Sequence, residues 1–461
     1  MALKLQVARL LPNWPLLMPT LSSLFAIGPY GFTDDYTVSI EMSQNPNDAI
    51  KAITGTGRPI LAILQYLLFR IGNSFDYFVL LHILASLLVF LCTIRFYKSL
   101  LSVGITISKS RYVAGSVPLI VPGFLIMQSW LVCIPVLFAV SSTLLAVENY
   151  YAGKSVYLFS FYFGLAFFIY QPVGGLALAL ILVLWPFSSK SKESHVFSFL
   201  RFKGLFLLGM IGLIDLMIMK IGKELGWISG QRSSIVKDLN SKYLWFQNEA
   251  SRTILDIFNP WHRTWVTIFI STIVFLWCAS YLIHKHSNYF VYLGLAYLMV
   301  TAPSLLTLES WASNRSLMGA QWITALVFVL VVFEIKPIWK FRNLVLLIFT
   351  IYGSMSIFLA WRLPQINEID FIKKSVSIQQ CENAKYVKKS EWYQSFTRFT
   401  SYDEFGIPST TQAWSVIPLT VLICKDKGIM RDVQSFSLTT EEAPDSKNTI
   451  NYFDLLKNKT M

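Results

Sequence analysis

The stretch DYFVLLHILASLLVFLCTIR, residues 76–95, decides the fold class of this chain. Between its terminal Asp76 and Arg95 it contains no Asp, Glu, Lys or Arg. A helix of about 20 apolar residues is long enough to cross the ~30 Å hydrocarbon core of a bilayer. The stretch therefore predicts a membrane-spanning helix.

Similar apolar runs lie on both sides of this stretch, from Trp14 to Trp361. A shorter apolar segment, residues 59–71, predicts an interfacial or re-entrant helix. Pro118, Pro122 and Pro186 fall within two of the runs and predict kinks. We predict a mainly α fold, a polytopic bundle of about eleven spans near residues 10–30, 76–95, 112–128, 131–149, 155–171, 173–187, 204–222, 264–283, 288–306, 317–334 and 342–361.

The composition supports a membrane protein. Of the 461 residues, 54% are hydrophobic and only 14% are charged, whereas a typical soluble domain has about 25% charged residues. A soluble globular enzyme, a secreted disulfide-rich scaffold and a disordered chain are therefore excluded.

The net charge of +13 is unevenly distributed. Residues 362–461 hold 13 basic and 12 acidic residues, so nearly all of the excess lies in residues 1–361, between the apolar runs. Basic residues in that position determine membrane topology, and nucleic acid is rejected as a partner.

The positive-inside rule predicts the orientation. With the N-terminus in the cytoplasm, 15 of the 26 basic residues before position 362 face the cytoplasm, together with only three acidic residues. Residues 1–361 are then a membrane core with external loops at 33–58 and 223–263, and residues 362–461 form a small external C-terminal domain. Within that domain, residues 414–424 alternate in a way that predicts a strand.

The external loop 33–58 carries the densest group of polar residues. Asp34 and Asp35 stand where the first span ends, and Glu41 follows them. Partial desolvation would raise the pKa of a carboxyl there towards the range of a general base. The alternatives are that Asp34 caps the following helix and that the pair binds a divalent metal; no cofactor is otherwise indicated.

Arg58 stands in a Gly-Thr-Gly-Arg-Pro turn, residues 55–59, before the next apolar segment. Its guanidinium could bind a phosphate through two nitrogens at the depth of the lipid headgroups, or could simply contact membrane lipids. Arg315 is a second candidate of the same kind. Weaker candidates for substrate binding are Gln171, Trp261, His262 and Glu309, and Asp215 is an acid within a span.

Two of the five cysteines, Cys381 and Cys424, lie in the external C-terminal domain. Cysteines in an oxidising compartment tend to pair, which predicts a disulfide between them. The alternative is two free thiols, which would follow from an inverted topology.

Taken together, these motifs resemble the bacterial serotype-converting O-antigen glucosyltransferases, a family of the glycosyltransferase C superfamily. The resemblance covers most of the chain and is carried by short motifs: Asp34-Asp35, Gly57-Arg58-Pro59, Tyr170-Gln171, and Asp403-Glu404-Phe405-Gly406-Ile407-Pro408-Ser409 followed by Trp414 and Pro418.

The resemblance implies an enzyme of the bacterial inner membrane. Such an enzyme would transfer a hexose, glucose in this family, from undecaprenyl phosphate to lipid-linked O-antigen in the periplasm, with Asp34 or Asp35 as the base and Asp403 and Glu404 among the residues that bind substrate. The rival interpretation is a flippase or permease for a lipid-linked sugar; a structural protein or receptor would not need the two acids.

Overall fold

The computed structural model describes residues 11–188, 205–226, 236, 238–258, 265–286, 288–306, 312–389, 409–439 and 449–452. Within these residues the fold is mainly helical, and each of the eleven expected spans contains helix. The helices are α2 (Met18–Ser23), α3 (Thr33–Gln44), α4 (Pro46–Thr54), α5 (Pro59–Ile71), α6 (Phe75–Val103), α7 (Ile107–Ile120), α8 (Pro122–Ser129), α9 (Ile134–Tyr151), α10 (Val156–Ile169), α11 (Gln171–Gly174), α12 (Leu176–Leu184), α14 (Leu205–Glu224), α15 (Leu239–Trp245), α16 (Ser251–Leu255), α17 (Trp265–Lys285), α18 (Tyr289–Leu306), α19 (Met318–Val332), α20 (Lys336–Lys340), α21 (Arg342–Met355), α22 (Leu363–Ser375), α23 (Ile378–Asn383) and α24 (Ala413–Asp426). Short 3₁₀ segments include η1 (Leu11–Leu17), η3 (Leu131–Cys133) and η10 (Val433–Ser435), and η8 (Ser356–Arg362) is a π-helix.

Within the described residues, five helical segments are long and apolar enough to cross a membrane, and a bent pair of helices makes a sixth candidate. The bent pair is α7 and α8, which meet at an angle of 71° where Pro122 begins α8. Such a break is expected because proline cannot continue the hydrogen bonding of the preceding helix. The five segments are Phe75–Val103, Leu131–Tyr151, Trp265–Lys285, Tyr289–Leu306 and Arg342–Ser375.

The longest described helix, α6, shows how local sequence limits these helices. The Ser74 hydroxyl accepts a hydrogen bond from the Tyr77 backbone N–H at the start of the helix, and Gly104 ends it with a φ of 102°. A left-handed residue of this kind is usually glycine because a Cβ would be strained there. The helix therefore begins and ends at positions that its own sequence specifies.

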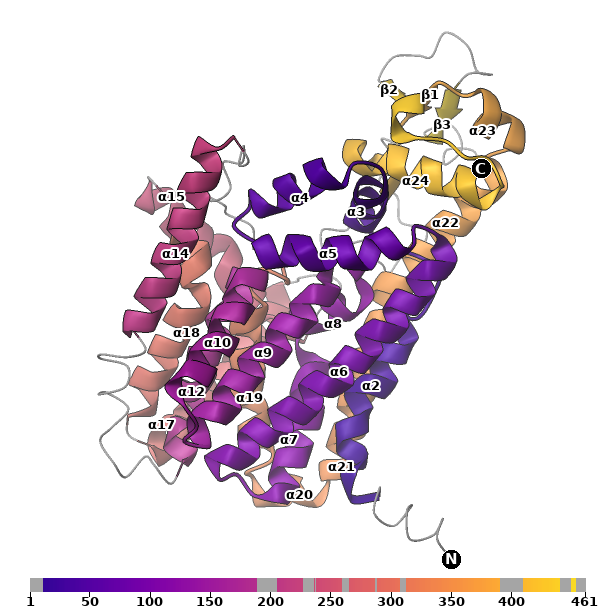
Figure 1. Ribbon diagram of the computed structural model, residues 1–461. Coiled ribbons are helices and arrows are strands. Elements are labelled where there is room, and N and C mark those ends of the chain that lie inside the picture. The colour runs from indigo at the N-terminus through magenta and orange to yellow at the C-terminus, as the bar shows by residue number, and fades with distance from the viewer. Residues whose placement is uncertain are drawn as a thin grey trace, which may run out of the picture.

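The helix α5 lies across one end of the bundle, above α9 and α10 (Figure 1). It begins at Pro59, a favoured first residue of a helix, and Gly72 follows its last residue. Its residues match the predicted short segment 59–71, and α3 and α4 lie at the same end of the bundle.

The C-terminal part lies at that end too (Figure 1). It contains α23, α24 and a small parallel sheet in the order β2 (Ser437–Thr439), β1 (Tyr386–Lys388), β3 (Thr449–Asn451). A disulfide joins Cys381 of α23 to Cys424 of α24, with the two Cα atoms 5.4 Å apart. The structure thus contains the pairing that the sequence analysis expects.

One element of the C-terminal part differs from the sequence-based prediction. Residues 414–424, predicted as a strand, lie in the helix α24; this segment is buried on nearly every side, so its sequence lacks the apolar and polar faces that distinguish a helix from a strand. The position expected for the domain boundary, after Trp361, lies within the helical run Arg342–Ser375, in which α21, η8 and α22 follow one another without a break.

The C-terminal part packs against α3. The Thr37 hydroxyl donates to the Trp414 carbonyl oxygen at 2.9 Å, and the Gln44 side chain bonds to Asp432 and to the Val433 backbone N–H. Segments nearly 400 residues apart in the chain therefore meet at the end of the bundle that also holds the residues described next.

Candidate functional site

Asp35 is enclosed at the meeting point of two helix N-termini. Its Oδ2 accepts hydrogen bonds from the backbone N–H groups of Phe32, at 2.7 Å, and Leu131, at 3.2 Å. Its Oδ1 accepts from the Val132 N–H at 2.7 Å. Backbone N–H groups at the start of a helix lack partners within the helix, and a carboxylate satisfies them well.

The residues before Asp35 are suited to this arrangement. A Cβ placed on Gly31 would lie 2.8 Å from the Cβ of Asp35, so only glycine fits there. The Tyr36 hydroxyl donates to the Gly31 carbonyl oxygen at 2.6 Å and holds the turn closed. The sequence Gly-Phe-Thr-Asp-Asp-Tyr, residues 31–36, thus folds as a unit around Asp35.

The Asp35 carboxyl is completely buried. Burial, the largest effect, raises its pKa to about 7 against the opposing effect of the three backbone donors, and the neighbouring charge of Asp34 raises it further. Because both oxygens already accept hydrogen bonds from the protein, Asp35 is placed to hold α3 against η3 and has little freedom to reach a substrate.

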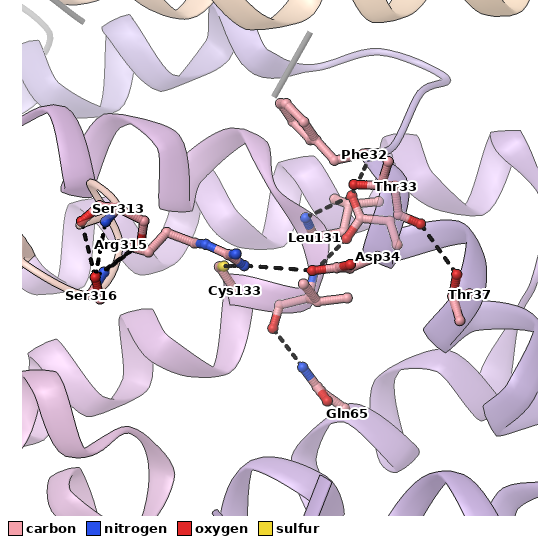
Figure 2. Close-up of polar contacts among 12 residues, drawn as sticks. Phe32, Thr33, Asp34, Thr37, Gln65, Leu131, Cys133, Ser313, Arg315 and Ser316 are labelled. Atoms are coloured by element: carbon pink, nitrogen blue, oxygen red, sulfur yellow. Dashed lines mark hydrogen bonds and ion pairs between the residues drawn. The ribbon is translucent and has the colours of Figure 1, made fainter. Parts of the chain in front are cut away.

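Asp34 has the opposite environment. Its side chain is 39% exposed and its Oδ2 lies 3.7 Å from Nη1 of Arg315, whose side chain is 15% exposed. Figure 2 shows the Arg315 side chain extending across to Asp34. The sequence-based candidates Asp34 and Arg315, 281 residues apart, therefore form a partly exposed ion pair.

Arg315 is held by aromatic stacking. Its Cζ lies 3.8 Å from the centre of the Trp130 ring, a cation–π contact. The Phe32 ring also stacks on Trp130, with the ring centroids 5.0 Å apart and an interplanar angle of 21°. Nη1 of Arg315 also lies 3.9 Å from the Cys133 sulfur. The guanidinium is therefore positioned before any ligand arrives.

The turn that carries Arg315 is fixed by a buried glutamine. The Gln321 side chain donates to Asn314 Oδ1 at 2.8 Å and to the Thr253 carbonyl oxygen at 2.9 Å, and it accepts from the Gly123 N–H at 2.9 Å. A Cβ on Gly123 would lie 2.2 Å from the Asn314 carbonyl oxygen. Contact between α8 and the Arg315 turn is therefore close and requires glycine.

Arg58 belongs to a second group. Its Nε donates to Gln171 Oε1 at 3.1 Å, and its Cζ lies 4.7 Å from the centre of the Tyr170 ring. The Gln171 amide donates to the Gly57 carbonyl oxygen at 2.5 Å, where Gly57 has a φ of 80°. The candidates Arg58 and Gln171 are thus brought together from distant parts of the chain.

The helix α5 connects the two groups. Arg58 immediately precedes α5, and Gln65 within it donates to the Val132 carbonyl oxygen at 2.8 Å, beside the N–H that binds Asp35 (Figure 2). Seven residues of helix span about 10 Å. Arg58 and Gln65 are therefore separated by about 10 Å along the helix axis.

The remaining candidates differ in what the structure says of them. Glu41 is exposed on α3. Asp215 falls within α14. Within the described part of the chain, no three His, Cys, Asp or Glu side chains are grouped as metal ligands. The candidates that lie outside the described residues are Trp261, His262, Glu309, Asp403 and Glu404.

Sequence reasoning missed Trp130, Gln65 and Gln321. Trp130 lies in an apolar run, where a tryptophan most often faces lipid or packs in the core. A buried glutamine within an apolar helix is the signal that could have identified Gln65 and Gln321, because a buried amide needs partners.

Comparison of the chain with family models, with curated proteins and with solved structures gives no match.

Proposed function

We propose that this chain is a membrane glycosyltransferase that moves a hexose, glucose by its family resemblance, from a polyprenyl-phosphate donor to lipid-linked O-antigen. The observation that carries the proposal is the ion pair of Asp34 and Arg315 at one end of an apolar helical bundle. A partly exposed carboxylate beside a prearranged guanidinium supplies a proton acceptor and an anion-binding group within one site.

In the proposed reaction Asp34 acts as the general base. It takes the proton from a hydroxyl of the acceptor sugar while that oxygen attacks the anomeric carbon of the donor. The bond between the anomeric carbon and the phosphate oxygen breaks, and the negative charge passes to the polyprenyl phosphate. Asp35 is a positioning residue in this scheme, since three backbone N–H groups occupy its oxygens.

The leaving phosphate is assigned to the arginines. Arg315 stacks on Trp130 and Arg58 stacks on Tyr170, so each planar guanidinium is held in one orientation. A prearranged donor stabilises developing charge without reorganising during the reaction. We assign both guanidinium groups to the donor phosphate, with Arg315 on the side of Asp34.

The proposal includes a topology. The shorter apolar helices α10, α12 and α19 run beside the longer ones, and with α2, α14 and the bent pair they complete eleven crossings. We place the N-terminus in the cytoplasm and α3, α4, α5 and the C-terminal domain in the periplasm, at the bacterial inner membrane. The basic residues support this orientation.

The test is transfer by the purified chain in detergent micelles, with radiolabelled undecaprenyl-phosphate glucose and O-antigen linked to its lipid carrier. A transferase produces labelled glycan in micelles, because transfer needs no sealed membrane. No transfer in micelles, together with movement of the donor across the bilayer in sealed proteoliposomes, would identify a flippase and overturn the proposal.

A further inference from the structure

One face of α3 carries a polar row that begins at Asp34. Asp34, Thr37, Glu41 and Gln44 are spaced by three, four and three residues, which places them on one side of the helix. The C-terminal part binds two members of the row: Thr37 bonds to the Trp414 carbonyl oxygen, and Gln44 bonds to Asp432 and Val433. Asp34 and Glu41 are left accessible beside these contacts.

Trp414 lies where the C-terminal part meets α3. It lies in the first turn of α24, and its residue surface is 56% exposed although its carbonyl oxygen is only 2.9 Å from the Thr37 hydroxyl. Thr37 and Asp34 are neighbours on the helix surface, about 5–6 Å apart at Cβ. The exposed indole therefore belongs to a residue whose backbone lies close to the proposed base. Figure 1 shows α24 beside α3, at the end of the bundle where α5 lies.

The start of α24 is anchored firmly. Glu368 of α22 is buried, and its carboxylate accepts hydrogen bonds from the backbone N–H groups of Ser409 and Thr410 and from the Thr410 hydroxyl. Burying a carboxylate is costly unless it is well hydrogen-bonded. These contacts attach the segment that leads to Trp414 to α22, which continues the helical run of α21.

We infer that Trp414 is the stacking platform for the acceptor sugar, holding it beside Asp34, with Glu41 available to hydrogen-bond its hydroxyls. The apolar face of a pyranose packs on an indole, while its hydroxyls need polar partners, and this junction offers both. The inference rests on the proposed function, since it assigns the acceptor side of that site.

The test uses the purified full chain in detergent and polysaccharide released by mild acid from the lipopolysaccharide of the host strain. Binding is measured by calorimetry, which does not depend on transfer. Trp414→Ala is expected to weaken polysaccharide binding and to raise the KM for the acceptor by about tenfold, the loss of one aromatic contact. The KM for the donor is expected to stay unchanged.

Three further variants make the result specific. Trp414→Phe keeps a stacking face and is expected to retain most of the binding. Met430→Ala removes a side chain of the same domain that is 77% exposed, and binding is expected to be unchanged. Asp34→Asn is expected to bind polysaccharide as the unaltered chain does while losing transfer.

The inference is overturned if the unaltered chain shows no saturable binding, if Trp414→Ala binds as tightly as the unaltered chain, or if this variant changes the donor KM as strongly as the acceptor KM. Failure of the proposed function has a different signature. Normal transfer by Asp34→Asn, with binding lost in Trp414→Ala, would remove the base assignment and leave the sugar-binding platform in place.

Discussion

Asp34 and Asp35 are adjacent residues with different chemical environments. Asp35 is buried with both oxygens bonded to backbone N–H groups, whereas Asp34 is partly exposed and faces Arg315. Neighbouring residues of a helix point about 100° apart, so one side chain can hold the structure while the next stays available for chemistry.

The raised pKa of Asp35 predicts a pH-dependent stability. Its folded value of about 7 lies above its ordinary value of 3.8, so protonation stabilises the fold fully below pH about 4, and this stabilisation is lost as the pH rises through about 7. The thermal unfolding midpoint of the unaltered chain, measured relative to that of Asp35→Asn, should therefore fall between pH 4 and pH 8.

The Asp35→Asn variant is also expected to be less stable, by roughly 1–3 kcal/mol at low pH, because an amide nitrogen, unlike the hydroxyl oxygen of a protonated carboxyl, cannot accept a hydrogen bond from a backbone N–H. A difference between the two midpoints that rises with pH would mean that the folded protein favours the charged carboxylate, contrary to this account.

Arg58 offers a prediction with a matched control. Arg58→Lys keeps the charge but loses the planar fork and the Nε bond to Gln171. We expect the KM for the polyprenyl-phosphate donor to rise about tenfold, measured in micelles with the acceptor saturating. Arg70, at the other end of α5, also lies over a tyrosine ring, that of Tyr66, and Arg70→Lys should leave the donor KM unchanged. If Arg58→Lys and Arg70→Lys changed the donor KM equally, Arg58 would be a contact with lipid headgroups and its assignment to the donor phosphate would be wrong.

At the scale of elements, the buried amide of Gln321 joins α8, α16 and the turn that carries Arg315. Gln321→Ala leaves three buried polar groups without this partner and is expected to cost about 3 kcal/mol of stability. It should also lower transfer more than expression, because Arg315 loses its fixed position. Thermal unfolding in detergent measures the first effect. Gln379→Ala, on the exposed side of α23, is the control and should change neither.

The sequence predicted the elements where length and hydropathy suffice. The stretch 76–95 is part of α6, and the segment 59–71 matches α5. The sequence-based prediction was wrong for α24, because a short buried run rich in Val, Ile and Leu has the same pattern in a strand and in a helix. The sequence also could not show which of Asp34 and Asp35 is enclosed. Two of the N–H groups that bind Asp35 belong to Leu131 and Val132, almost 100 residues away.

At the scale of the whole molecule, α3–α5 and the C-terminal part lie at the same end of the bundle (Figure 1). Fusions to alkaline phosphatase, which is active only outside the cytoplasm, test which compartment this end faces. We expect activity after Asn47 and after Met461 and none after Lys192, because basic residues concentrate on the opposite face. Activity after Lys192 with none after Met461 would invert the topology, and the disulfide of Cys381 and Cys424 would then lie in a reducing compartment.

The most direct test of the central claim is mass spectrometry of surface polysaccharide from cells that carry the unaltered chain, the Asp34→Asn variant, or no copy. We predict one added hexose per repeat unit with the unaltered chain. The variant, which keeps its size and its place in the membrane, should lose about 10²-fold or more of the modification, as expected when a general base is removed. Full modification by Asp34→Asn at matched expression, or no added hexose with the unaltered chain, would contradict the account.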